Sequence, residues 1–138
     1  MNYTITTRVD APFDDVIAAV TTALEAEKFG ILADIDVQAT LREKLDVESN
    51  QYRILGACNP SLAHQALTHE PNLGTLLPCN VIVYETDESV VVSAVDPRRL
   101  VDITENPQLE EISTDVYERF EQVITAVSNQ FSSEGASK

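Results

Sequence analysis

Apolar and polar residues alternate along residues 3–9, which predicts a half-buried strand at the start of the chain. From Phe13 to Leu24 the apolar residues recur at helical spacing, after a proline that suits the first turn of a helix. The same two periods predict the remaining elements: strands 31–36, 52–57, 81–84 and 90–95, helices 37–45 and 60–68, and a long last helix from about residue 106. Gly30 is the expected stop signal after the first helix.

The polarity of these strands decides between two fold classes. Strands that alternate with helices can form a parallel sheet, but most of these strands alternate in polarity instead of being continuously apolar. A short polar loop also joins the strands 81–84 and 90–95 into a hairpin. We therefore predict a single α+β domain over residues 1–131, with a curved, mainly antiparallel sheet and the long first and last helices on one face. Residues 132–138 are expected to form a frayed tail.

The charge balance narrows the classes of partner. The chain has 9 Lys and Arg against 23 Asp and Glu, a net charge of −14, which repels phosphate backbones and anionic membranes. No apolar run approaches the roughly 20 residues that cross a bilayer, so we expect a soluble cytoplasmic protein that binds neither nucleic acid nor membrane. A surface rich in acids and poor in lysine favours a halophilic protein, whose self-repulsion is screened by molar salt, over an ordinary acidic domain.

Both cysteines of the chain are followed by asparagine, in the pairs Cys58-Asn59 and Cys79-Asn80. Each pair lies where an apolar run meets a turn signal, a place where scaffolds present functional side chains. If the strands 52–57 and 81–84 are antiparallel neighbours, both pairs lie at one edge of the sheet. The four residues are therefore candidate ligand-binding residues.

Three interpretations of the two thiols remain open. They are small buried apolar side chains, or a thiol or metal site, or a disulfide, which is the least expected in an intracellular chain. A metal site would need more ligands, and His64 and His69 point about 140° apart on a helix and cannot share one ion. We assign no residue as a metal ligand, and the residues identify no cofactor.

A second candidate cluster is acidic. Asp34 and Asp36 lie two positions apart in a predicted strand, with Lys44 in the next helix, and could form an acid–base or cation-binding pair. Alternatively, Asp36 caps the helix 37–45 and Asp34 is solvated. Arg98 and Arg99 could bind an anion, although paired arginines on a turn are more often simply solvated.

Three segments of the chain are recognisable. The segments are FGILADIDV from residue 29, YRILGACNP from residue 52 and LLPCNVIVYE from residue 76, and Lys44 and Asp96-Pro97 fit the same pattern. From Tyr3 to about Val127, the chain resembles the family called domain of unknown function 302. The resemblance implies a fold similar to the TATA-binding-protein-like arrangement with insertions, often as a homodimer. It implies no activity, so no catalytic residue is carried over.

Two functions of different classes follow from these observations. The first is a binding or interaction domain, which holds a small ligand or metal in a pocket between sheet and helices near the two Cys-Asn pairs. The second is a thiol-dependent enzyme or redox-responsive protein that uses Cys58 and Cys79. We also expect a homodimer, because the uncharged strand 90–95 must be interior, covered or paired across a two-fold axis.

Overall fold

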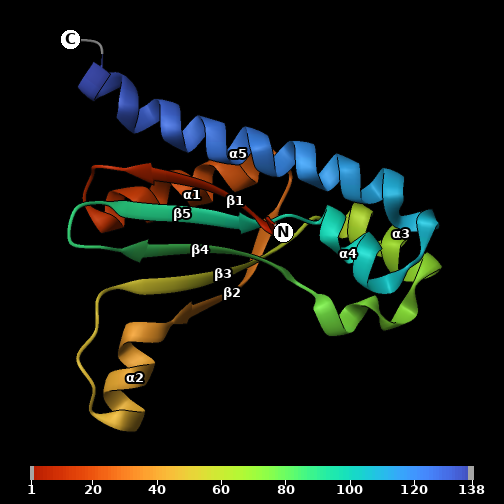
Figure 1. Cartoon of the computed structure of the whole chain (residues 1–138), viewed down its shortest axis with the longest axis horizontal. Coiled ribbons are helices and arrows are strands. Elements are labelled where there is room, and N and C mark those ends of the chain that lie inside the picture. The colour runs from red at the N-terminus through yellow and green to blue at the C-terminus, as the bar shows by residue number, and fades with distance from the viewer. Residues whose placement is uncertain (1, 137–138) are drawn as a thin grey trace.

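The computed structural model describes residues 2–136 and contains five strands and five α-helices (Figure 1). Two short 3-10 helices complete the structure. The elements in chain order are β1 (Thr4–Val9), α1 (Phe13–Ala26), β2 (Gly30–Asp36), α2 (Val37–Leu45), β3 (Tyr52–Cys58), α3 (Pro60–His69), η1 (Pro71–Leu76), β4 (Cys79–Glu85), β5 (Val90–Val95), α4 (Arg98–Thr104), η2 (Pro107–Leu109) and α5 (Glu110–Ala136). Within the described residues, no helix is both long and apolar enough to cross a membrane. Helix α5 is assigned through Ala136, and residues 137–138 lie outside the described part. The frayed tail expected for residues 132–138 stays a prediction.

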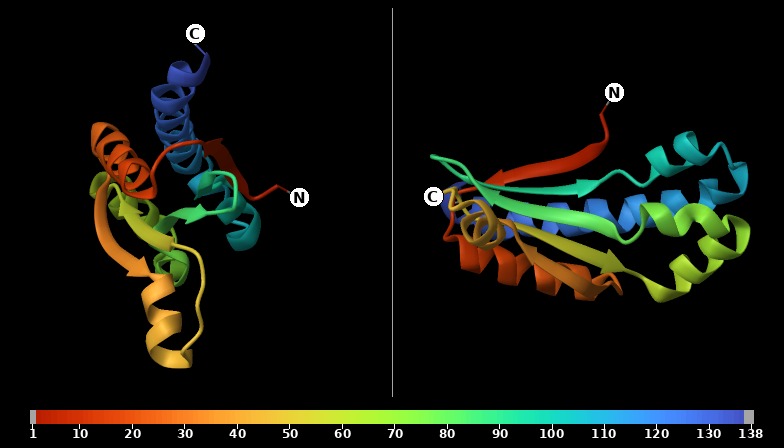
Figure 2. Two further views of the ribbon diagram at one scale, coloured as in Figure 1. Left: turned by 90° about the vertical axis from the view of Figure 1, so that its left-hand side faces the viewer. Right: turned by 90° about the horizontal axis from the view of Figure 1, so that it is seen from below.

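The five strands form one sheet in the order β1-β5-β4-β3-β2, with every neighbouring pair antiparallel. Helices α1 and α5 lie beside each other on one face of this sheet (Figure 2). This arrangement confirms the predicted α+β fold. Strand β5, whose side chains are uncharged, lies inside the sheet between β1 and β4, so it does not form an open edge. Of the three alternatives for this strand, the interior one is correct, and the strand gives no argument for a dimer.

The main core fills the space between the sheet and the helices α1 and α5. Phe120 of α5 is completely buried there, and its ring stacks on Phe29 with 4.9 Å between the ring centroids. A second, smaller core lies beyond the strand ends and is built from Ala66, Leu73 and Leu109. The molecule therefore has two apolar centres, and Phe29 stands at the boundary between them, because it also lines the cavity described below.

The end of α1 differs from the prediction. Lys28, not Gly30, adopts the left-handed conformation, with φ of 71°. The amide of Phe29 donates to the carbonyl of Leu24 and the amide of Lys28 to that of Glu25, the hydrogen-bond pattern of a Schellman cap. Gly30 instead opens β2 with ordinary φ. The helix stop therefore lies at Lys28, two residues earlier than the glycine predicts.

Strand β2 carries a bulge that the alternation of its sequence does not reveal. Ile31 pairs with Ala57, and Ala33 pairs with Gly56, so Leu32 is an extra residue without a register partner. The bulge reverses the alternation. Ile31 therefore shares a sheet face with Asp34 instead of with Ala33, with which an uninterrupted alternation would place it.

Candidate functional site

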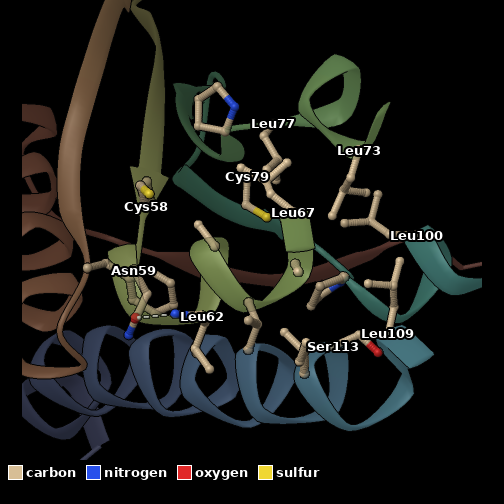
Figure 3. A pocket seen from close by; sticks show the side chains of 18 of the residues that line it. Cys58, Asn59, Leu62, Leu67, Leu73, Leu77, Cys79, Leu100, Leu109 and Ser113 are labelled. Atoms are coloured by element: carbon tan, nitrogen blue, oxygen red, sulfur yellow. Dashed lines mark hydrogen bonds between the residues drawn. The ribbon is translucent and has the colours of Figure 1, made fainter. Parts of the chain in front are cut away.

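A cavity of about 320 Å³ lies where β3 ends and β4 begins (Figure 3). Residues from α3, η1, α4 and α5 line it together with these strand ends. Among the described residues, its lining contains no charged side chain. The polar side chains among the described lining residues are the amide of Asn59, the hydroxyl of Ser113 and the thiols of Cys58 and Cys79. The site is therefore an apolar cavity that contains both cysteines.

The pairing of β3 with β4 brings the two cysteines to this cavity. Ala57 is the register partner of Cys79, and Cys58 is the next residue along β3. Their Cα atoms are therefore at most about 9 Å apart, which agrees with the predicted antiparallel edge. Because successive residues of a strand point to opposite faces, the two side chains leave opposite faces of the pair. Both are free thiols, and this orientation does not suit a disulfide without backbone movement.

The thiol of Cys79 is held in its neutral form. Burial raises its pKa to about 11, and the proximity of Cys58 adds to the shift. The nucleophilic species of cysteine is the thiolate, so at neutral pH this side chain behaves as a small apolar group. The site therefore offers soft, uncharged sulfur and not an activated nucleophile at Cys79.

The two asparagines have different positions. Asn59 is buried and caps α3, because its Oδ1 accepts a hydrogen bond of 3.2 Å from the amide of Leu62. Asn80 is exposed and pairs with Gly56, so it does not line the cavity. Of the two asparagines, only Asn59 belongs to the site.

Gly56 allows Pro78 to close one wall of the cavity. A Cβ atom on Gly56 would lie 2.7 Å from Cγ of Pro78 and 3.4 Å from Cβ of Ala33. A contact of 2.7 Å with a rigid proline ring is not tolerated, so only glycine permits this approach. Gly56 lies two residues before Cys58. The close approach of Pro78 explains why a glycine stands near the end of β3.

The acidic candidates lie at the other end of the sheet. Asp36 pairs with Arg53, whereas Gly30 pairs with Cys58. Along β2, Asp36 and Gly30 are about 20 Å apart, so the two register pairs lie at opposite ends of the strand. The predicted residues therefore do not form one site. The antiparallel register brings one set to the cavity and carries the other away from it.

Local partners account for the acidic group. Arg53 donates two hydrogen bonds to the carboxylate of Asp34, and this contact holds the pKa of Asp34 below its usual range. Asp36 caps α2, since its Oδ1 accepts a hydrogen bond of 2.9 Å from the amide of Ala39. Lys44 is exposed in the last turn of α2. Among the described residues, no three His, Cys, Asp or Glu side chains are grouped so that they could hold a metal ion.

Arg98 and Arg99, which were open to two interpretations, are each paired with an acidic residue of the chain. Arg98 donates a hydrogen bond of 2.7 Å to the carboxylate of Asp96, and its guanidinium carbon Cζ lies 3.6 Å from the ring centroid of Tyr117. This contact with Arg98 holds the pKa of Asp96 below its usual range. Arg99 forms an ion pair of 3.0 Å with Asp102. The segment instead fixes the start of α4, and its buried Pro97 lines the cavity.

Comparison with known proteins agrees with this architecture. The model of the family described as domain of unknown function DUF302 matches residues 5–127, which is most of the chain. The chain belongs to this family. The DUF302 domain is also similar to a crystal structure of an uncharacterized conserved protein DUF302 from Bacillus stearothermophilus. The two are 28% identical with a TM-score of 0.86, and the match covers 92% of this chain and 99% of the other. A comparison with curated proteins finds no match.

Proposed function

We propose that this DUF302 domain is a binding domain that holds a small molecule in the cavity at the ends of β3 and β4. The observation that carries the proposal is the cavity itself. Its volume of about 320 Å³ lies within the range of about 300–1,000 Å³ that is typical of small-molecule sites. A domain of this size that needed only a packed core would fill such a space with side chains, because protein interiors contain few voids larger than a water molecule.

The alternative of a thiol-dependent enzyme has less support. The raised pKa of Cys79 keeps its sulfur protonated at neutral pH. His64 and His69, the two histidines of the chain, are exposed, and neither lines the cavity. The cavity therefore contains no histidine that would act as a general base for either thiol. These features favour binding over catalysis.

Filling the cavity tests this proposal. Titration of the domain with indole, a neutral aromatic probe, is expected to shift backbone amide signals around the cavity in two-dimensional NMR spectra. Replacing Ala63 of the lining by phenylalanine should abolish these shifts, because the ring would occupy the space of the probe. The matched control is Ala39→Phe, at an exposed position of α2 outside the lining, which should leave them unchanged.

Two results would contradict the binding function. One is a set of indole-induced shifts spread over the surface, and the other is a set that persists unchanged in folded Ala63→Phe. Dispersed amide signals establish that the variant is folded. If Ala63→Phe does not fold, Ala63→Leu fills less of the cavity and should reduce the shifts in the same region.

The proposal includes a homodimer that associates through the sheet face opposite α1 and α5. Among the described residues, no helix covers this face (Figure 2). One row of register partners across the face is uncharged and mostly apolar, and consists of Thr6, Ser93, Ile82, Ile54 and Ile35. Ile35, at the edge, is 48% exposed. A salt-rich cytoplasm, as the composition predicts, would screen the repulsion between two chains of charge −14.

Light scattering in molar salt tests the homodimer. The expected mass is twice the chain mass of 15.2 kDa, because salt screens the acidic surfaces and leaves apolar contact to drive association. Ile82→Lys, in the middle of the uncovered face, should return the mass of one chain. Leu76→Lys, at an exposed position of η1, is the control that should remain dimeric. A monomeric wild-type protein at micromolar concentration would refute the dimer.

A further inference from the structure

Two exposed leucines stand at the mouth of the cavity. Leu32 of β2 is 68% exposed and Leu67 of α3 is 37% exposed, although both line the cavity. Deeper lining residues are closed off from solvent, and Leu73 and Leu109 are only 3% and 2% exposed. The cavity therefore opens to solvent between β2 and α3, and its entrance is apolar on both sides.

The position of Leu32 results from the bulge in β2. As the extra residue of the bulge, Leu32 has no partner on β3, and its side chain is released from the ordinary alternation of the strand. A large apolar side chain that is exposed on an edge strand gains nothing for folding. The bulge instead places it at the cavity, where an occupant would cover it.

Among the described residues, the interior of the cavity offers no charged partner, and two of its polar atoms are already hydrogen-bonded. Oδ1 of Asn59 accepts from the amide of Leu62, and Oγ of Ser113 donates to the carbonyl of Glu110 at 3.0 Å. The thiol of Cys79 is neutral over the physiological range. A charged group that entered the cavity would lose its hydration and find no counter-charge, which is strongly unfavourable.

We propose that the ligand of this cavity is a neutral, apolar small molecule, and that Leu32 and Leu67 are the specificity residues that close over it at the mouth. This inference rests on the proposed binding function and names its ligand class. The C-terminal tail of the chain is not the occupant, because its sequence SSEGASK is polar. The C-terminal end of α5 also lies at the opposite end of the molecule from α3 and α4 (Figure 1).

A pair of matched fluorescent probes tests the ligand class. N-phenyl-1-naphthylamine is neutral, and 8-anilino-1-naphthalenesulfonate has the same rings with one added sulfonate. In molar salt, where the Debye length is about 3 Å, the net charge of the protein contributes little to the difference. The neutral probe is expected to bind at least about tenfold more tightly, because the cavity cannot pair a charge. Binding of either probe is assigned to the cavity only if Ala63→Phe removes it.

Variants at the mouth test the two leucines. Leu32→Ser and Leu67→Ser should each weaken binding of the neutral probe by about five- to tenfold, because each removes apolar area that the probe covers. Leu45→Ser, at a 65% exposed position of α2 outside the cavity, is the matched control and should not change it. Since all three leucines are exposed, the three variants should melt at similar temperatures.

The possible failures are distinguishable. If neither probe binds in a manner that Ala63→Phe removes, the proposed binding function fails together with this inference. If the anionic probe binds the cavity as tightly as the neutral one, the ligand class is wrong and the binding function stands. If the neutral probe binds but Leu32→Ser and Leu67→Ser behave like Leu45→Ser, the assignment of the mouth is wrong.

Discussion

Replacing Phe120 by alanine is expected to lower the free energy of unfolding by about 3–5 kcal/mol. Phe120 belongs to α5, its side chain is completely buried in the main core, and its ring stacks on Phe29. Alanine would remove this contact and leave a cavity between α5 and the sheet, since the surrounding helices and strands relax only in part. A typical domain is stable by about 5–15 kcal/mol, so this substitution removes a large share of the total. Urea denaturation at constant salt measures it.

The same substitution at Phe131 provides the control. Phe131 also lies in α5, but its side chain is only partly buried at the margin of the core. Phe131→Ala should therefore cost much less than Phe120→Ala. Equal losses for the two variants would show that burial at Phe120 is not what stabilises the packing of α5. Because Phe29 also lines the cavity, Phe120→Ala should in addition weaken the binding of the neutral probe.

The free energy of unfolding is expected to fall by roughly 2–3 kcal/mol between about pH 9 and pH 11 because of Cys79 alone. In the folded protein, burial raises the pKa of this thiol from 9.0 to about 11. The unfolded chain therefore loses the proton first as the pH rises. In this window the folded state binds more protons than the unfolded state, so alkali favours unfolding. Below pH 9 the contribution of Cys79 is complete, and above pH 11 it is lost.

Other groups also titrate in this range, so the effect is measured as a difference. Urea denaturation of the wild type and of Cys79→Ala is compared at several pH values, and the difference should decrease as the pH rises from 9 to 11. Cys58→Ala is the control and should retain most of the alkaline loss. If Cys79→Ala loses as much stability as the wild type over this interval, Cys79 is not held neutral by burial.

The sequence by itself determined the local elements and their caps. The alternation of residues 3–9 and the helical spacing after Phe13 predicted β1 and α1. Asp36 and Asn59 cap the helices that follow them, because a short polar side chain before a helix can satisfy a free backbone amide. These features depend on residues that are near neighbours in the chain. The antiparallel edge that joins the two cysteine segments followed from the same polarity pattern.

Only the tertiary structure decided the strand order, the bulge and the extent of the cavity. Strand β5 is interior because β1, the first strand of the chain, pairs along its outer side, and no local pattern encodes that partner. The register of β2 against β3 separated Asp34 and Asp36 from the cysteines, since antiparallel strands carry neighbouring segments to opposite ends of a sheet. The leucines of the cavity have the same apolar spacing as core residues in α3 and η1. Whether such a side chain fills a core or lines a space depends on the distances between packed elements, and these are fixed only when the whole chain has folded.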